Sequence, residues 1–133
     1  MLSILHIEDD TIEALKLERI LKDMDGGHRL VNAKHGEEAL SIIREQAHPN
    51  LILLDLNMPK MSGFEFLQIL KNDQYLHHIP VVILTTSRNR EDVIRCYQIG
   101  IAGYIMKPLK YADYKQTIQK VVDYWNSNEY VAN

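Results

Sequence analysis

The sequence has little of the chemistry that marks exported or membrane-bound proteins. It contains one cysteine, Cys96, so no disulfide can form within the chain. No apolar run approaches the length that spans a bilayer, and residues 1–10 lack the basic and apolar segments of a signal peptide. We therefore expect a cytoplasmic protein that does not insert into a membrane.

Clustered positive charge is also missing. The 15 Lys and Arg residues are outnumbered by 18 Asp and Glu residues, which gives a formal net charge of −3 at pH 7. The basic residues are scattered, so they form no stripe that could neutralise a phosphate backbone. Direct binding to nucleic acid is not expected. The sequence has no P-loop and no GxGxxG motif either, so it predicts no bound nucleotide.

What is present fits one domain. The chain has 133 residues, of which 46% are hydrophobic, and this is enough to bury one core. We assign residues 1–126 to this domain and predict that the polar segment 127–133 is a flexible tail.

Short apolar runs alternate with longer stretches of helical period. The runs Leu51–Leu54 and Val81–Leu84 are continuously apolar, as in parallel strands covered by helices on both faces. The alternation predicts a doubly wound α/β fold with a parallel sheet. The expected strands are Leu2–Ile7, Arg29–Ala33, Leu51–Leu54, Pro80–Leu84 and Ala102–Met106. The expected helices are Thr11–Met24, Gly36–Ala47, Gly63–Lys71, Arg90–Ile99 and Tyr111–Asn126.

Reactive side chains follow four of the five expected strands. Glu8 and Asp9 follow the first strand, Asp55 the third, Thr85 the fourth and Lys107 the fifth. The carboxyl ends of parallel strands lie along one edge of a sheet, where ligands bind. These residues, distant in sequence, are therefore expected to form one site.

The charges of this site predict its chemistry. Three carboxylates brought together, those of Glu8, Asp9 and Asp55, would repel one another unless cations lay among them. Lys107 is one cation, and an oxygen-only ligand set with room for water suits Mg²⁺ as the other. We expect Asp9 and Asp55 to bind the metal directly, and Glu8 mostly through water.

A metal-bound carboxylate beside a hydroxyl and an ammonium is suited to in-line phosphoryl transfer. Asp55 would attack phosphorus and become an aspartyl phosphate. Thr85 would donate a hydrogen bond to one phosphoryl oxygen, and Lys107 would hold another as a compact charge.

Five short motifs, in this order and spacing, resemble the receiver domains of bacterial two-component response regulators. They are Ile7–Asp10, Leu53–Pro59, Met61–Gly63, Leu84–Thr85 and Gly103–Pro108, and the resemblance extends from Ile4 to about Trp125. It implies a flavodoxin-like (βα)5 fold with strand order 2-1-3-4-5. It also implies a stand-alone receiver in a phosphorelay, with a sensor histidine kinase or a histidine phosphotransfer protein as the phosphoryl donor. No enzyme activity is implied beyond the domain's own phosphorylation and slow dephosphorylation.

The same resemblance implies roles for further residues. The main-chain carbonyl of Asn57 would be a metal ligand, and the Lys107–Pro108 peptide would be cis. Thr85 would move toward the phosphoryl group while Tyr104 turns from outward to inward. The switched surface would comprise the fourth helix, fifth strand and fifth helix. It would bind a downstream protein or form a weak dimer of an otherwise monomeric domain.

One position departs from the family pattern. The residue after the switch threonine is often Ala, Gly or Ser, and here it is Thr86. A larger side chain should slow the access of water and small donors, so a longer-lived phosphate is expected, with Asn57 and Ser87 as further modulators. The run Thr85–Ser87 and the terminal pair Tyr124–Trp125 are also similar to receivers paired with bacterial phytochromes.

Other interpretations of the same residues are less consistent with the sequence. A haloacid-dehalogenase-type phosphatase needs a second aspartate two residues after the nucleophile, and Asn57 there cannot exchange protons. A second alternative is an interaction module of the same fold that is not phosphorylated. The sequence disfavours it because all four residues needed for phosphorylation are intact: Asp9, Asp55, Thr85 and Lys107. Nothing specific in the sequence supports a flavin.

Two other features are expected to be structural. The six histidines show no metal-ligand spacing, and His6, in the first expected strand, should be a buried ring with a hydrogen bond. The stripe on the last expected helix, which includes Tyr111 and Tyr114, has the spacing of a helix that packs against the sheet.

Overall fold

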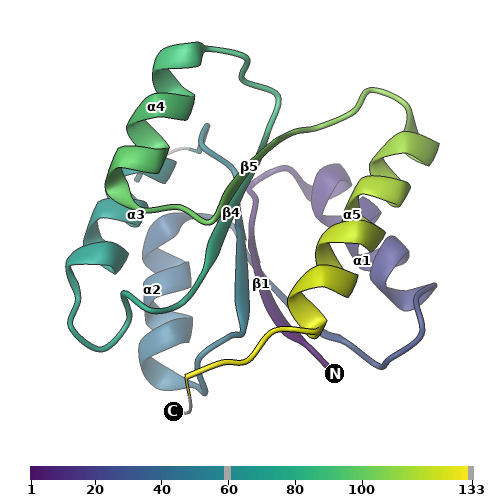
Figure 1. Ribbon diagram of the computed structural model, residues 1–133, viewed down its shortest axis with the longest axis horizontal. Helices are drawn as coiled ribbons and strands as arrows, with labels where there is room; N and C mark the ends of the chain where they lie inside the picture. Colours follow the sequence, from purple (N-terminus) through teal and green to yellow (C-terminus); the bar gives the residue numbers. More distant parts are fainter. Residues whose placement is uncertain (59–60, 132–133) are drawn as a thin grey trace.

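The computed structural model describes residues 1–58 and 61–131, in which five strands alternate with five helices (Figure 1). The strands are β1 (Ser3–Ile7), β2 (Arg29–Ala33), β3 (Leu51–Leu54), β4 (Val81–Thr85) and β5 (Gly103–Met106). The helices are α1 (Thr11–Lys22), α2 (Gly36–Glu45), α3 (Gly63–Asn72), α4 (Arg90–Ile99) and α5 (Tyr111–Asn126). Pro59, at the end of one of the five motifs, lies outside the described residues, as do residues 132–133 of the expected tail.

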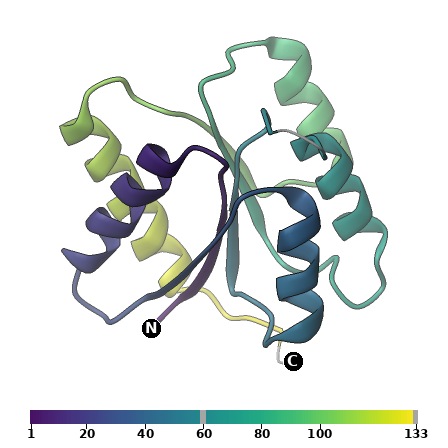
Figure 2. The same cartoon turned by 180° about the vertical axis from the view of Figure 1, so that it is seen from behind.

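The five strands form one parallel sheet in the order β2-β1-β3-β4-β5. Helices α2, α3 and α4 cover one face, and α1 and α5 cover the other (Figures 1 and 2). The doubly wound flavodoxin-like fold and its strand order are thereby confirmed. Every element lies within two residues of its expected bounds.

The central strands are buried on both faces because their side chains alternate between two cores. Ile52 and Leu54 of β3 pack in the cluster beneath α2, α3 and α4. Leu51 and Leu53 pack in the cluster beneath α1 and α5. The continuous apolar run at β3 therefore satisfies both layers, which is why it differs from an alternating strand.

Two local features place the strand-end loops next to the helices that follow. The Asp10 carboxylate accepts hydrogen bonds from the backbone N–H groups of Ile12 (2.9 Å) and Glu13 (3.1 Å), so α1 begins directly after the first loop. At the start of α3, a Cβ on Gly63 would lie 2.7 Å from the Leu56 Cα and 2.8 Å from the Asp55 carbonyl oxygen. Glycine is required there for α3 to approach the loop after β3 this closely.

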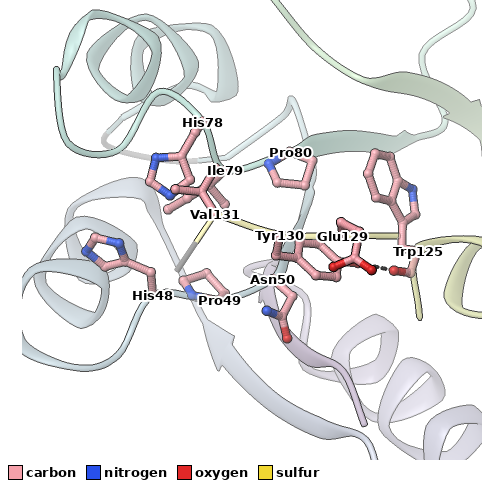
Figure 3. Close-up of a pocket in the computed structure, with 10 residues that line it drawn as sticks. All are labelled: His48, Pro49, Asn50, His78, Ile79, Pro80, Trp125, Glu129, Tyr130 and Val131. Carbon is pink, nitrogen blue, oxygen red and sulfur yellow. Dashed lines mark hydrogen bonds between the residues drawn. The ribbon is translucent and has the colours of Figure 1, made fainter. Parts of the chain in front are cut away.

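The segment after α5 crosses the edge of the sheet at which the strands β3 and β4 begin. Tyr130 packs against the α1/α5 core and donates its hydroxyl to the Trp125 carbonyl. A pocket of about 330 Å³ lies here, with His48 and His78 on one flank and Trp125 on the other (Figure 3). The flexibility of segment 127–133 stays a prediction. No helix in the described part of the chain is both long and apolar enough to cross a membrane.

Candidate functional site

The expected site residues lie together at the carboxyl edge of the sheet. Backbone hydrogen bonds between neighbouring strands set their positions: the Asp55 N–H donates to the Ile7 carbonyl (3.1 Å) and the Lys107 N–H to the Thr85 carbonyl (2.8 Å). A cleft of about 460 Å³ opens above them. The expected residues that line it are Glu8, Asp9, Asp55, Asn57, Thr86 and Lys107.

The three expected carboxylates form a compact cluster. One oxygen from each of Glu8, Asp9 and Asp55 lies within 4.8 Å of the other two. Glu8 is 2% exposed and Asp55 9%, whereas Asp9 is exposed and leaves one side open to water. An oxygen-only donor set with an open side fits a hard divalent cation that keeps several of its waters.

Lys107 neutralises part of this cluster. Its Nζ lies 2.7 Å from Glu8 Oε1 and 3.8 Å from Glu13 Oε2, and the Lys107 side chain is 10% exposed. Within the described structure, no ion pair joins Lys107 to Asp55 at 4.0 Å or less. The ammonium therefore sits on the Glu8 side of the cleft.

Sequence reasoning missed Glu13. It lies in the first turn of α1, where it also accepts a hydrogen bond from Lys16 Nζ (3.1 Å). Glu13 lies four residues after Asp9, and a helix that begins at Thr11 therefore carries its side chain near the same cleft. This spacing could have predicted its position.

Burial makes two carboxylates of the site, those of Glu8 and Asp55, hard to ionise. It raises the pKa of Glu8 to about 7, although the hydrogen bond and the charge of Lys107 act in the opposite direction. Burial also raises the pKa of Asp55, and the Lys107 charge again opposes this. A further cation among these oxygens would favour their ionised forms.

A chain of hydrogen bonds connects the end of β4 to β5. Thr85 is fully buried, and its Oγ1 accepts from the Ser87 N–H (3.2 Å). The Tyr104 hydroxyl donates to the Ser87 carbonyl (3.1 Å), and its half-buried ring packs against the α2–α4 core. Ser87 thus joins Tyr104 to Thr85. Thr86, between them, is exposed at the cleft.

One expectation for this edge was wrong. The described residues contain no cis peptide bond, so the Lys107–Pro108 peptide is trans. Trans is the more stable form of an X-Pro bond by about 0.5–1 kcal/mol, and Lys107 reaches Glu8 with this geometry.

His6 also differs from expectation. It is buried on β1 as predicted, but its Nδ1 has no hydrogen-bond partner among the described residues. Burial lowers the pKa of His6 to about 3, and the nearby charge of Lys107 lowers it as well. The ring is therefore neutral in the folded protein at any ordinary pH.

Comparison with known proteins agrees with this geometry. The family model for the response regulator receiver domain matches residues 4–119. The chain belongs to this family. Response regulator Rcp1 of Synechocystis sp. is 35% identical to this receiver domain over 128 residues, which cover 92% of this chain and 87% of Rcp1.

Solved receiver structures superpose closely on this one. The Mn(2+)-bound form of Rcp1 has a TM-score of 0.90 at 33% identity and covers 99% of this chain and 100% of its own. The phosphorylated cyanobacterial phytochrome response regulator RcpA has a TM-score of 0.90 at 32% identity, covering 95% and 94%. The chain is thus a receiver domain of two-component signalling, a class that interacts with histidine kinases or phosphotransfer proteins.

Replacing His6 by leucine should make this receiver domain less sensitive to acid. Folded His6 stays neutral down to about pH 3, whereas an unfolded histidine binds a proton near pH 6.5, so the native state loses stability as the pH falls between these values. The free energy of unfolding of His6→Leu minus that of wild type should rise by about 1.4 kcal/mol per unit as the pH falls.

Urea unfolding at a series of pH values measures this difference. His77→Gln, at an exposed loop position, is the matched control for the loss of one histidine side chain. A pH-independent difference for His6→Leu would contradict the account of the buried ring.

Proposed function

We propose that this receiver domain accepts a phosphoryl group on Asp55 with the help of Mg²⁺. Asp9, Asp55 and the main-chain carbonyl of Asn57 would hold the metal, with Glu8 acting through water. The observation that carries the proposal is the cluster of three carboxylates beside Lys107. The Mn(2+)-bound form of Rcp1 supports it, because Mn²⁺ and Mg²⁺ favour the same oxygen ligands.

The side chains of the site have distinct tasks in this reaction. An Asp55 carboxylate oxygen attacks phosphorus, and the bond from phosphorus to the donor breaks in line with the new bond. Lys107 turns from Glu8 to one phosphoryl oxygen, and the Thr85 hydroxyl donates a hydrogen bond to another. Mg²⁺ held by Asp9, Asp55 and the Asn57 carbonyl would supply positive charge that offsets the phosphoryl group and the carboxylates. Apart from this reaction and the slow hydrolysis of the aspartyl phosphate, in which water attacks phosphorus and inorganic phosphate leaves, the domain turns over no substrate.

Several contacts must act together to switch the domain. Moving an equilibrium from 1:99 to 99:1 takes about 5.5 kcal/mol. One hydrogen bond to a charged group supplies about 1.5–3 kcal/mol, so Thr85 alone is insufficient. Lys107, the metal and repacking around Tyr104 supply the rest, and the Ser87 loop joins Thr85 to Tyr104.

The surface formed by α4, β5 and α5 is the proposed output. It carries the exposed apolar side chains of Ile94, Tyr97 and Met106, which suit a protein partner or a weak dimer. The proposed phosphoryl donor is a sensor histidine kinase or a histidine phosphotransfer protein. The likeness to the phytochrome response regulator RcpA favours a phytochrome-type kinase. Asn57, which cannot act as a general acid, disfavours the phosphatase alternative.

Incubation with acetyl phosphate and Mg²⁺ should attach one phosphoryl group to the protein. Intact-mass measurement should show stoichiometric labelling that is stable to acid and labile to base, as for an acyl phosphate. Removal of Mg²⁺ with EDTA should suppress it, because the transferred oxygens then lack their main countercharge. Asp55→Asn is the matched control and should remain unlabelled.

Two results would contradict this proposal. Sustained turnover of p-nitrophenyl phosphate over many equivalents would indicate a phosphatase. Absence of labelling from acetyl phosphate and from every histidine kinase tried would indicate an interaction module that is not phosphorylated.

Thr86→Ala should speed both the gain and the loss of phosphate. The exposed Thr86 side chain lines the cleft and obstructs the approach of small donors and water. We expect both rates to rise about fivefold, equivalent to about 1 kcal/mol in each barrier. The rates are measured by quenched labelling with acetyl phosphate and by its decay after the donor is removed. Thr117→Ala, on α5, is the control, and wild-type rates for Thr86→Ala would refute the role of this residue.

A further inference from the structure

Tyr114 places a buried hydroxyl at the functional cleft. It projects from the start of α5, is 4% exposed, and lines the same cleft as Glu8, Glu13 and Lys107. Its hydroxyl has no hydrogen-bond partner among the described residues. A buried donor without an acceptor is destabilising, so native proteins have few of them. Its position requires an explanation that core packing alone does not give.

The charges around this hydroxyl keep it a donor. Burial raises the pKa of Tyr114, and the negative charges of Glu13 and Glu8 raise it further. The phenol therefore stays protonated. The cleft that Tyr114 lines also holds the two carboxylates that pair with Lys107, those of Glu8 and Glu13.

The two carboxylate oxygens of Glu13 pair with two different lysines. Oε1 accepts from Lys16 at 3.1 Å, and Oε2 faces Lys107 at 3.8 Å. If Lys107 turns to a phosphoryl group, Oε2 loses its cation while Oε1 keeps its own. A partly buried carboxylate oxygen is then left without a cation in the cleft that the buried Tyr114 hydroxyl, itself without an acceptor, also lines.

We propose that Tyr114 is a positioning residue of the phosphorylated state: its hydroxyl donates to Glu13 Oε2 when Lys107 leaves that oxygen for the phosphoryl group. The inference rests on the proposed role of Lys107 and adds a second residue pair to it. The new hydrogen bond stabilises the arrangement in which Lys107 holds the phosphoryl group. It also joins the site to α1 and α5, independently of the Thr85–Ser87–Tyr104 chain.

Tyr114→Phe should act in opposite directions on the two states. Without a phosphoryl group, the variant loses only an unsatisfied hydroxyl, so its melting temperature should equal or exceed that of wild type. With Mg²⁺ and beryllofluoride, a phosphoryl analogue, its affinity for the analogue should fall about tenfold, because the state that binds it lacks one hydrogen bond to a charged group. Fluorine NMR of the bound analogue measures the affinity.

The exposed neighbour Tyr111, which lines the same cleft, supplies the control. Tyr111→Phe should leave both measurements unchanged. Wild-type affinity in Tyr114→Phe would overturn the proposal. So would an equal loss of stability in both states, because a packing role predicts that result. Failure of the wild-type protein to bind beryllofluoride would instead refute the proposed function.

A double-mutant cycle with Glu13→Ala tests the named acceptor. In the Glu13→Ala background, Tyr114→Phe should change the affinity by less than about twofold, because the acceptor of the hydrogen bond is gone. A tenfold loss that persists in this background would show that the hydroxyl binds elsewhere, and would overturn the pairing with Glu13.

Discussion

The contact between the Lys107 ammonium and the Glu8 carboxylate is the interaction on which the rest of this site depends. At 2.7 Å, with Glu8 2% exposed, it pairs two charges that would be costly to bury separately. Glu8 follows β1 and Lys107 follows β5, with β3 and β4 between them in the sheet. Because the sheet is parallel, the loops that carry Glu8, Asp55 and Lys107 all leave from one edge, so the fold makes this charge pairing possible.

Much of this arrangement is predictable from local sequence because its causes are local. Continuous apolar runs such as Leu51–Leu54 identify strands buried on both faces, and a side chain such as Asp10 marks the start of a helix. The site follows from one general property of parallel sheets, that strand ends share an edge. This property groups Asp9, Asp55 and Lys107 from the sequence alone, although they lie far apart along the chain.

The missed features depend on distances between elements, which the sequence pattern does not specify. The contact of Glu13 with Lys107 depends on how α1 packs against the sheet. The hydrogen bond of Tyr104 to Ser87 depends on the path of the loop after β4. The unpaired Nδ1 of His6 depends on which polar groups lie opposite one ring. Such contacts follow from rotamers and helix placement, so two sequences with the same apolar pattern could differ in all of them.

Two proposed routes for the signal from the cleft are the hydrogen-bonded chain from Thr85 through Ser87 to Tyr104, and the proposed pairing of Glu13 with Tyr114. The second requires that Lys107 exchange its carboxylate partners for the phosphoryl group, as the proposed function also does. Heteronuclear NMR of the lysine ammonium groups, with the Lys107 signal assigned by Lys107→Arg, tests this exchange most directly. We expect Mg²⁺ and beryllofluoride to shift this signal and to end the contact of the Lys107 ammonium with Glu8. An unchanged Lys107 signal in protein loaded with the analogue would contradict it.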